Sequence, residues 1–423
     1  MTPPPTDPAP GGLPDRSASS PAVTSAPPSP PRTAPGRTGG ATRALVLATA
    51  GFGINFWAWA LVAPLAPDLR EQLGLSVVEQ SVLVALPVLV GSVGRIPVGA
   101  LTDRFGGRLM FPVISLATAV PVLALAWADS YPLLLVVGFV LGIGGTAFAI
   151  GMPVLAGWYP PARRGAAFGI YGIGMGGTAV ATFTTVPLSD ALGEDAPFLI
   201  VAAALAGYAA LAWLLLRDGP ARTATSGSVL RASREVLRLP VTWYLSLLYA
   251  VGFGGFVAFS VYLPAYLGNA YDLAAADAGA RTAGFVLVAI IARPLGGWLS
   301  DRFHPSDVLV TAFAVAAVLA VVTAFTPPLL PLGTIAFLGL AACLGGAAGG
   351  VFAFVGQLAP ADRVGAVTGV VGAAGGLGGF LPPLIMGGVY AMENSYAIGL
   401  MLLSDIALAA AVFTWLRLGR RAG

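Results

Sequence analysis

The chain has 423 residues, of which 57% are hydrophobic and only 10% are charged. This composition excludes an ordinary soluble domain and indicates an integral membrane protein. A formal net charge of +3 is too small to favour binding to nucleic acid.

The first 42 residues form a segment unlike the rest of the chain. Residues 1–42 are rich in proline, serine, alanine and threonine and contain no apolar run. Such a segment cannot bury enough apolar surface to fold, so we predict a disordered cytoplasmic tail. No hydrophobic segment typical of a signal peptide precedes the first apolar stretch, which we therefore expect to insert as a helix of the mature protein.

The remainder of the chain contains repeated long apolar stretches. A membrane-spanning helix needs about 20 mostly apolar residues. Twelve stretches meet this requirement, at 43–66, 79–101, 109–128, 132–157, 164–189, 196–216, 241–267, 279–300, 307–326, 331–356, 363–391 and 394–416. We therefore predict an all-α integral membrane protein with 12 transmembrane helices.

The spans divide into two halves of six helices. We predict an N-terminal half at 43–217, a linker at 218–240, a C-terminal half at 241–417 and a short tail at 418–423. Arginines gather before the first span, in the linker and after even-numbered spans, whereas the opposite loops carry mainly aspartate and glutamate. Positive residues collect in cytoplasmic loops, so both termini and the linker are predicted to be cytoplasmic. Every basic residue is arginine, and this lysine-free, alanine- and glycine-rich usage favours a bacterial protein of the inner (plasma) membrane.

Two arginines lie in the middle of predicted spans, at matching places in the two halves. Arg95 belongs to the run G-R-I-P-V-G-A-L-T-D-R-F, and Arg293 to the run A-R-P-L-G-G-W-L-S-D-R-F, 198 positions further on. Each precedes an aspartate, Asp103 or Asp301, by eight residues. An arginine in mid-membrane costs about 2.5–3.5 kcal/mol on insertion scales, so it rarely occurs without a function. The matching places indicate one anion site shared between the halves.

The charge of these arginines has no adjacent counterpart. At 1.5 Å per residue, Asp103 lies about 12 Å along the helix from Arg95, too far to neutralise it directly. The one other carboxylate deep in a span is Asp405. An anionic substrate would complete the site, because the planar fork of guanidinium donors suits a planar oxyanion. In the alternative interpretation, each arginine pairs with Asp405, a helix carbonyl or water. Asp405 itself could be a proton-linked group, a partner of one arginine, or a structural residue at the lipid edge or a crevice.

Glycines repeat with the same spacing in the fifth and eleventh spans. Four positions match at a separation of 200 residues, namely Gly165, Gly169, Gly172 and Gly176 with Gly365, Gly369, Gly372 and Gly376. Gly174 and Gly375 lie within the same runs. Small residues let helix backbones approach closely in a membrane, so we expect helices that pack closely and slide. A backbone surface that faces the substrate is the alternative.

The fifth span also contains the G-x-G-x-x-G spacing of dinucleotide-binding proteins, at Gly172, Gly174 and Gly177. That motif needs a strand before it and a helix after it, whereas here it lies inside an apolar helix. We therefore expect no nucleotide, and indeed no cofactor. Cys343 stands alone in an apolar stretch and His304 is the only histidine, so the sequence predicts neither a disulfide nor a metal site.

The organisation in two parallel six-helix halves resembles the major facilitator superfamily. The second span ends in G-A-L-T-D-R-F-G-G-R, which resembles the loop signature of that superfamily. The resemblance implies that Asp103 with Arg104, and Asp301 with Arg302, hold a cytoplasmic gate between the halves.

Further runs resemble the nitrate/nitrite porter family within that superfamily. They are G-I-G-G-T-A-F-A-I-G-M in span four, S-L-L-Y-A-V-G-F-G-G-F-V-A-F-S in span seven and G-A-V-T-G-V-V-G-A-A-G-G-L-G-G-F in span eleven. The resemblance covers nearly the whole predicted membrane region. It implies that Arg95 and Arg293 bind the anion. It also implies that Phe148, Tyr249 and Phe253 line the site, with ordinary helix packing as the alternative for these aromatic residues.

Met175 departs from the pattern of that family. An asparagine usually stands at this position, and its amide is expected to help orient the anion. Methionine cannot donate a hydrogen bond, so the identity of the substrate is less well determined than membership of the family.

We expect a secondary active transporter, not an enzyme, that moves nitrate and/or nitrite by alternating access. The transport would be nitrate/nitrite exchange or proton-coupled nitrate uptake. The alternatives are a carrier of the same fold for another small anion, such as cyanate or a carboxylate, or a drug/proton antiporter. The first half lacks the membrane acids that such an antiporter is expected to carry. The expected partners are a small inorganic anion and the lipid bilayer, without nucleic acid, and the expected oligomeric state is a monomer.

Overall fold

The structure is a computed structural model that describes residues 1–2, 35–222, 229–393 and 396–419. In this part of the chain every regular element is a helix. The predicted N-terminal tail lies largely outside the described residues, as does most of the predicted tail at 418–423.

The N-terminal half consists of helices that follow the first six predicted spans. They are α1 (Pro35–Trp59), α2 (Val62–Leu73), α3 (Val77–Phe105), α4 (Gly107–Leu125), α5 (Tyr131–Leu141), η1 (Gly142–Ala147), α6 (Phe148–Trp158), η2 (Pro161–Arg163), α7 (Arg164–Gly172), η3 (Ile173–Gly176), α8 (Gly177–Leu192) and α9 (Ala196–Leu215). The start of α3 is fixed by Ser76, which accepts a hydrogen bond from the backbone of Glu79 while the Glu79 carboxylate bonds back to Ser76.

The linker and the C-terminal half continue in the same manner. Their elements are α10 (Val229–Val236), α11 (Pro240–Tyr271), α12 (Ala275–Arg302), α13 (Pro305–Ala324), η4 (Leu329–Gly333), α14 (Thr334–Leu358), α15 (Val364–Glu393) and α16 (Ala397–Leu418). Among the described residues, 11 helical stretches are long and apolar enough to cross a membrane, and Val364–Gly379 in α15 is a shorter apolar one. These correspond to the 12 predicted spans and confirm the all-α membrane fold.

Three local features differ from the expected spans. The first helix begins at Pro35, earlier than the predicted 43, because a helix outside the membrane needs no apolar residues and hydropathy cannot locate its start. The linker contains the helix α10. Spans four and five each change from α- to 3₁₀-helix and back, at η1 and η3. Both segments are glycine-rich, and 3₁₀ turns inside a helix often mark functional positions.

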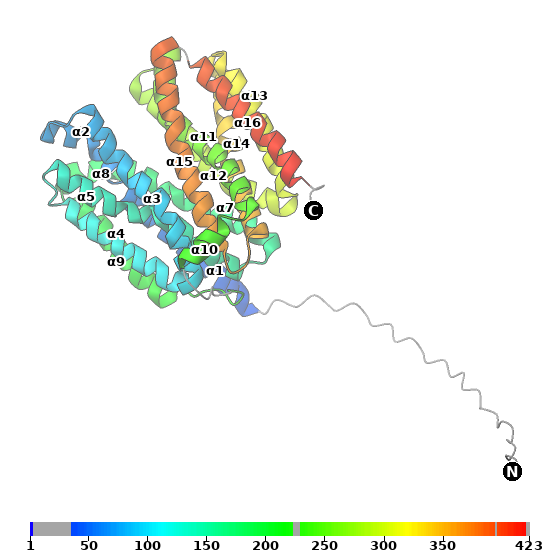
Figure 1. Cartoon of the computed structure of the whole chain (residues 1–423). Coiled ribbons are helices and arrows are strands. Elements are labelled where there is room, and N and C mark those ends of the chain that lie inside the picture. Colours follow the sequence, from blue (N-terminus) through cyan, green and yellow to red (C-terminus); the bar gives the residue numbers. More distant parts are fainter. Residues whose placement is uncertain (3–34, 223–228, 394–395, 420–423) are drawn as a thin grey trace.

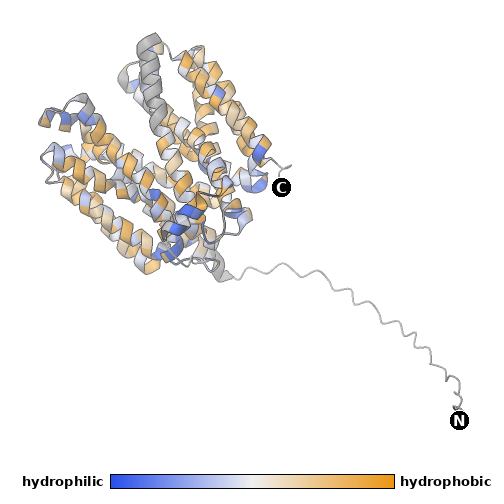
Figure 2. Cartoon of the chain, viewed as in Figure 1, coloured by the Kyte–Doolittle hydropathy of each residue, from blue (hydrophilic) through white to orange (hydrophobic). Residues whose placement is uncertain are grey.

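The two halves meet along two pairs of helices. Contacts between the halves are most extensive where α3 of the first half packs on α15 of the second, and where α7 packs on α12. Figure 1 shows the halves side by side, with α10 at the end where they come together. We call this end the linker end. Figure 2 shows hydrophobic residues over most of the helix surfaces and hydrophilic residues mainly near the linker end and at α2, as expected of a bundle surrounded by lipid.

Candidate functional site

Arg95 is buried between the two halves. It lies on α3 with 3% of its surface exposed. Its Nε donates a hydrogen bond to the carbonyl oxygen of Gly145 in η1 (3.1 Å), and its Nη1 donates to the carbonyl oxygen of Gly372 in α15 (2.7 Å). Gly145 belongs to the N-terminal half and Gly372 to the C-terminal half, so one guanidinium joins both.

Arg293 occupies the matching place on α12 and is equally buried, with 3% of its surface exposed. Its Nη2 donates to the hydroxyl oxygen of Tyr249 on α11 (2.8 Å), and its Nη1 lies 2.9 Å from the Met175 sulfur in η3. This guanidinium also bridges the halves, because Met175 comes from the first half and Tyr249 from the second. Both of its partners are side chains.

Aromatic rings connect the two arginines. The Arg95 guanidinium carbon lies 5.1 Å from the ring centroid of Phe148, and that of Arg293 lies 5.4 Å from the ring centroid of Phe253. Phe148 and Tyr249 have centroids 6.4 Å apart with planes within 8°, and Tyr249 and Phe253 have centroids 5.2 Å apart with planes within 6°. The three aromatic residues indicated by the family resemblance therefore lie together, as nearly parallel rings between the cations.

Phe352 of α14 completes this aromatic group and was not identified from the sequence. Its ring packs edge-on against Phe148 (5.1 Å) and Tyr249 (4.7 Å). Its sequence neighbourhood, G-G-V-F-A-F, reads as ordinary core of span ten. Only the three-dimensional packing identifies it.

Neither arginine has a carboxylate partner in the described part of the chain. The ion pairs found there join Arg231 and Arg363 to Glu235, Arg281 to Asp277 and Arg363 to Asp362. Asp405 is exposed on α16 and contacts neither arginine. Pairing with helix carbonyls, one form of the alternative interpretation, is found only for Arg95. Carbonyl dipoles satisfy donors but leave the positive charge uncompensated, so the site retains two cations.

The repeated glycines bring the helix backbones against the arginine-bearing helices. A Cβ at Gly369 would lie 2.3 Å from the Arg95 carbonyl oxygen, and one at Gly169 would lie 2.7 Å from that of Arg293. One turn further, a Cβ at Gly372 would lie 3.2 Å from the Arg95 side chain, and one at Gly172 would lie 3.4 Å from the Arg293 side chain. The close approach expected from the glycine spacing is present at both places.

The remaining glycines of these runs have different surroundings. A Cβ at Gly375 would meet the Tyr249 ring at 2.2 Å, and one at Gly376 would meet the Ser92 hydroxyl at 2.1 Å. Gly174 instead packs on Phe52 inside the N-terminal half, and Gly176 has open space around it. Ser92 lies one turn before Arg95, fully buried, and was not singled out from the sequence. Its three-residue spacing from Arg95 is the signal that could have identified it.

The two aspartates of the repeated triplets bind helix N-termini across the interface. The Asp103 carboxylate accepts hydrogen bonds from the backbone N–H of Gly365 and Ala366 at the start of α15 (2.8 Å each). The Asp301 carboxylate accepts from Gly165 and Ala166 at the start of α7 (2.8 and 2.7 Å). A carboxylate at a helix N-terminus is stabilised by unpaired N–H groups and by the helix dipole.

The arginines of the same triplets do not share this arrangement. Arg104 and Arg302 are both exposed, and their guanidinium carbons lie over the rings of Phe105 (5.1 Å) and Trp298 (5.8 Å) on their own helices. The four predicted gate residues therefore separate into two aspartates that join the halves and two arginines at the surface.

Further contacts at the linker end were not predicted. Arg164 donates from Nη1 to the carbonyl oxygen of Gly356 in the opposite half (2.6 Å). Arg363, at the start of α15, forms an ion pair of 2.6 Å with Glu235 of α10. Together with the two aspartates, Arg164 holds the halves closed at the linker end, and the Arg363–Glu235 pair fastens the linker helix α10, which also packs on α3, to α15.

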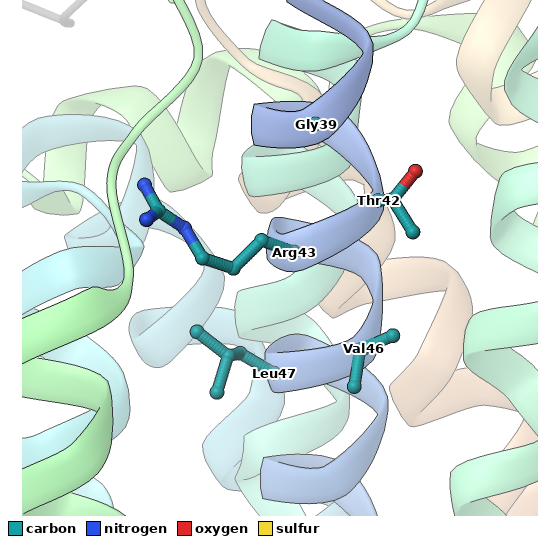
Figure 3. Close-up of a pocket in the computed structure, with 5 residues that line it drawn as sticks. All are labelled: Gly39, Thr42, Arg43, Val46 and Leu47. Carbon is teal, nitrogen blue, oxygen red and sulfur yellow. The ribbon is translucent and has the colours of Figure 1, made fainter.

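Among the described residues, one surface cavity lies away from the arginine pair, on α1, and a second lies beside Arg95. Figure 3 shows an open pocket of about 600 Å³ along one face of α1, lined by Gly39, Thr42, Arg43, Val46 and Leu47. A smaller cavity of about 180 Å³ lies between α3 and α15. Its lining is apolar except for Ser92, the residue one turn from Arg95.

Neither of the two residues considered for metal binding lies in a ligand cluster. In the described residues no three His, Cys, Asp or Glu side chains lie close enough to hold a metal ion. His304 is the N-cap of α13 and accepts a hydrogen bond from the Ser306 backbone. Cys343 is a partly buried free thiol.

Comparison with known proteins agrees with this fold and identifies the family. A model of the Major Facilitator Superfamily matches residues 48–383. The probable nitrate/nitrite transporter NarK2 of Mycobacterium tuberculosis is 50% identical over 374 residues, which cover 88% of this chain and 95% of that protein. The nitrite extrusion protein of Bacillus subtilis is 40% identical over 361 residues, which cover 85% and 90%.

Solved structures show the same architecture at much lower identity. The human organic anion transporter MFSD10 (TETRAN) has a TM-score of 0.73 and 15% identity, covering 88% of this chain and 99% of that one. The Major Facilitator Superfamily transporter FucP, in the outward conformation, has a TM-score of 0.71 and 19% identity, covering 88% and 98%. At these identities the likeness shows the fold alone.

Proposed function

Because the chain belongs to the nitrate/nitrite porter family of the major facilitator superfamily, we propose that it moves nitrate and nitrite across a membrane as a secondary active transporter. The observation that carries this proposal is the buried pair of Arg95 and Arg293. Each comes from a different half, each bridges to the other half, and neither has a carboxylate partner in the described part of the chain.

The aromatic rings supply the shape of the anion site. Phe148 and Tyr249 are nearly parallel with centroids 6.4 Å apart, which is less than twice a van der Waals contact of about 3.5 Å. A planar oxyanion one atom thick would fit between these rings once they separate slightly as the halves move. Its in-plane oxygens would then accept hydrogen bonds from the guanidinium groups, whose planar forks match an oxyanion.

The contacts at the linker end fit alternating access. We assign the linker end to the cytoplasmic side of the bacterial inner membrane, with both chain termini on that side. Asp103 and Asp301 would release the N-termini of α15 and α7 when the halves separate there. The glycine contacts at Gly169 and Gly369 would let the same helices slide. One chain contains both arginines and both halves, so the transport unit is a monomer.

Charge sets the energetics of the cycle. Moving one anion into a cell whose interior is negative costs about 2.3 kcal/mol per 100 mV of membrane potential. Without an anion, closing the site would bring two uncompensated cations together in a low-dielectric region. We therefore assign the protein an exchange mechanism, in which a second anion re-enters the site before the halves return. Net proton-coupled uptake is the competing mechanism.

Uptake of labelled nitrate into proteoliposomes tests this proposal. The vesicles are nitrite-loaded or empty, at fixed pH and zero membrane potential, and contain the wild type, Arg95→Ala or Arg293→Ala. Exchange predicts uptake only into loaded vesicles, lost in both variants. Uptake into empty vesicles that increases when an inward proton gradient is then imposed would replace exchange by symport, and arginine-independent uptake would contradict the site.

Met175 favours a second candidate, a carrier of the same mechanism for another small anion. Its sulfur is a weak acceptor and offers the substrate no hydrogen-bond donor. Inhibition of nitrate uptake by unlabelled cyanate, formate and nitrite distinguishes the two candidates. Nitrite should compete most strongly, and stronger competition by cyanate or formate would move the assignment to that anion.

A further inference from the structure

Three buried hydroxyl groups of α11 and α15 have no hydrogen-bond partner. They belong to Thr242 and Ser246 of α11 and to Thr368 of α15, with 0%, 4% and 0% of the residue exposed. None bonds to any residue that the structure describes. Other buried hydroxyls in membrane-spanning helices, such as those of Thr102 and Thr414, donate to the carbonyl four residues earlier in their own helix. Ser246 and Thr368 also have such a carbonyl within their helices, so their lack of a partner needs another explanation.

The two hydroxyls of α11 lie on the side of the helix that faces the arginine pair. Ser246 is four residues after Thr242 and three before Tyr249, so all three share one side. The flanking sides contact other helices, because a Cβ at Gly252 would lie 3.5 Å from α14 and one at Gly254 would lie 2.7 Å from α15. The side with Tyr249 lies between these contacts, and the Tyr249 hydroxyl accepts a hydrogen bond from the second arginine of the pair.

The third hydroxyl lies on the side of α15 that faces the N-terminal half. Thr368 is four residues before Gly372, so the two share one side of the helix. A Cβ at Gly372 would lie 3.0 Å from the Phe148 ring of the N-terminal half. On the flanking sides, a Cβ at Gly369 would meet α3 and one at Gly375 would meet α11. The Thr368 side chain therefore lies between these contacts and faces the interface of the halves.

All three hydroxyls lie nearer to the linker end than the arginine pair does. Both helices begin at the linker end, where the Asp103 carboxylate binds the first N–H groups of α15. At 1.5 Å per residue, Ser246 lies about 4.5 Å and Thr242 about 10.5 Å closer to that end than Tyr249. Thr368 lies about 6 Å closer to it than the α15 glycine at the arginine site. An anion that moves from the arginine pair to the linker end must cross this region, which is closed in the structure.

We propose that Thr242, Ser246 and Thr368, the hydroxyl stripe, line the passage between the arginine pair and the linker end and donate hydrogen bonds to the anion that crosses it. The proposal rests on the transport function proposed above. When the halves separate at the linker end, these hydroxyls lose their cover and gain a partner, which explains why they have none in the closed structure. A neutral hydroxyl binds an anion more weakly than a guanidinium does. The stripe therefore lets the anion move on instead of holding it.

Cysteine modification tests whether the stripe lines a passage. In a Cys343→Ala background, Ser246→Cys is compared with Thr414→Cys, because Thr414 is as fully buried in the same half but lies on α16, which packs mainly on α13. Inside-out membrane vesicles are treated with the anionic, membrane-impermeant thiol reagent sulfonatoethyl methanethiosulfonate. The Ser246→Cys protein should react about tenfold faster than the control, since a thiol reacts when it becomes accessible. The rate should rise further with Asp103→Asn, which favours opening at the linker end. Equal rates for the two cysteines would overturn the proposal.

Nitrate exchange and nitrate binding by hydroxyl variants test the role in transport. The combined variant Ser246→Ala, Thr368→Val should exchange nitrate about fivefold more slowly, as for the loss of neutral hydrogen bonds. Its equilibrium affinity for nitrate should stay within about twofold of wild type, because the arginine pair is intact. Thr368→Ser keeps a hydroxyl and should exchange at the wild-type rate, as should the control Thr414→Val.

Two results would overturn the role of the stripe in transport. One is an unchanged exchange rate in the combined variant. The other is an equal loss of rate and affinity, which would place the hydroxyls in the arginine site itself. A wild type that exchanges no nitrate would instead refute the proposed function. Cysteine modification needs no substrate, so it would still decide whether Ser246 lines a passage.

Discussion

Arg95 and Arg293 occupy matching places in a duplicated chain, but they are held by different kinds of group. The hydrogen bonds of Arg95 go to two backbone carbonyls, of Gly145 and Gly372. Those of Arg293 go to two side chains, of Met175 and Tyr249. The duplicated backbone thus determines where both guanidinium groups lie. Substitution can alter the partners of Arg293, because they are side chains, but not the backbone partners of Arg95. We infer that backbone carbonyls hold Arg95 in place and that the side chains around Arg293 set the selectivity of the site.

Substitution of either arginine by lysine should give the largest loss of nitrate exchange. It should also show most clearly that the two arginines differ. In Arg95→Lys the Nε donor is lost, and the single ammonium group cannot serve both carbonyls. A buried carbonyl left without its donor costs about 1–3 kcal/mol, in addition to the lost anion contact. We expect nitrate exchange below 1% of the wild-type rate in Arg95→Lys and about 10% in Arg293→Lys. The reverse order in proteoliposome assays would mean that the carbonyl contacts of Arg95 are unimportant.

Removal of the Tyr249 hydroxyl should act on Arg293 alone. Tyr249→Phe keeps the ring that faces Phe148 but leaves one Nη2 donor without its partner. We expect the KM for nitrate to rise about tenfold, as for a hydrogen bond to a charged group of about 1.5 kcal/mol. Tyr208→Phe is the matched control, because that buried hydroxyl donates to the Leu47 carbonyl. An equal change of KM in the control would assign the effect to packing.

The two aspartates at the linker end, Asp103 and Asp301, also occupy matching places but differ in burial. Asp103 is 5% exposed and Asp301 is half-buried, so the Asp103 carboxylate should stabilise closure more strongly. A carboxylate at a helix N-terminus contributes about 1 kcal/mol when partly buried, or roughly fivefold in a population. We expect Asp103→Asn to increase the open population about fivefold and Asp301→Asn about twofold.

Electron paramagnetic resonance distances measure these populations. Spin labels are placed at Arg108→Cys and Phe303→Cys, two exposed positions on opposite halves, in a Cys343→Ala background. The longer distance should gain population in both aspartate variants. An unchanged distribution in Asp103→Asn would show that this carboxylate does not hold the closed state.

Substitution of Met175 should give the smallest effect and the most specific one. Met175→Asn adds an amide donor beside Arg293, and a neutral hydrogen bond contributes about 0.5–1.5 kcal/mol. We expect the KM for nitrate to fall about threefold in Met175→Asn and to stay within about twofold of wild type in Met175→Leu. A matching fall in Met175→Leu would indicate that the shape of the side chain, and not the amide, decides affinity.

Hydropathy and internal repetition predicted the helices, the arginine pair and the close glycine contacts, because membrane insertion and duplication leave direct marks in a sequence. Resemblance to a family added Tyr249, Phe148 and Phe253. The partners of Arg95 could not be predicted, since Gly145 and Gly372 contribute only backbone oxygen. Phe352 and the outward orientation of Asp405 depend on how helices rotate against one another, which span boundaries do not determine. The helix α10 was missed because the search for long apolar stretches does not detect eight residues with a polar side, although their apolar residues recur at helical spacing.

If Arg95 and Arg293 hold one anion together, each chain binds one nitrate and needs both arginines to do so, which equilibrium binding measures. Equilibrium binding of labelled nitrate to the purified wild type, Arg95→Ala and Arg293→Ala should give one anion per chain in the wild type and none in either variant at the same concentrations. Two anions per wild-type chain, or one anion retained by either variant, would show that the arginines form separate sites and would contradict the clamp.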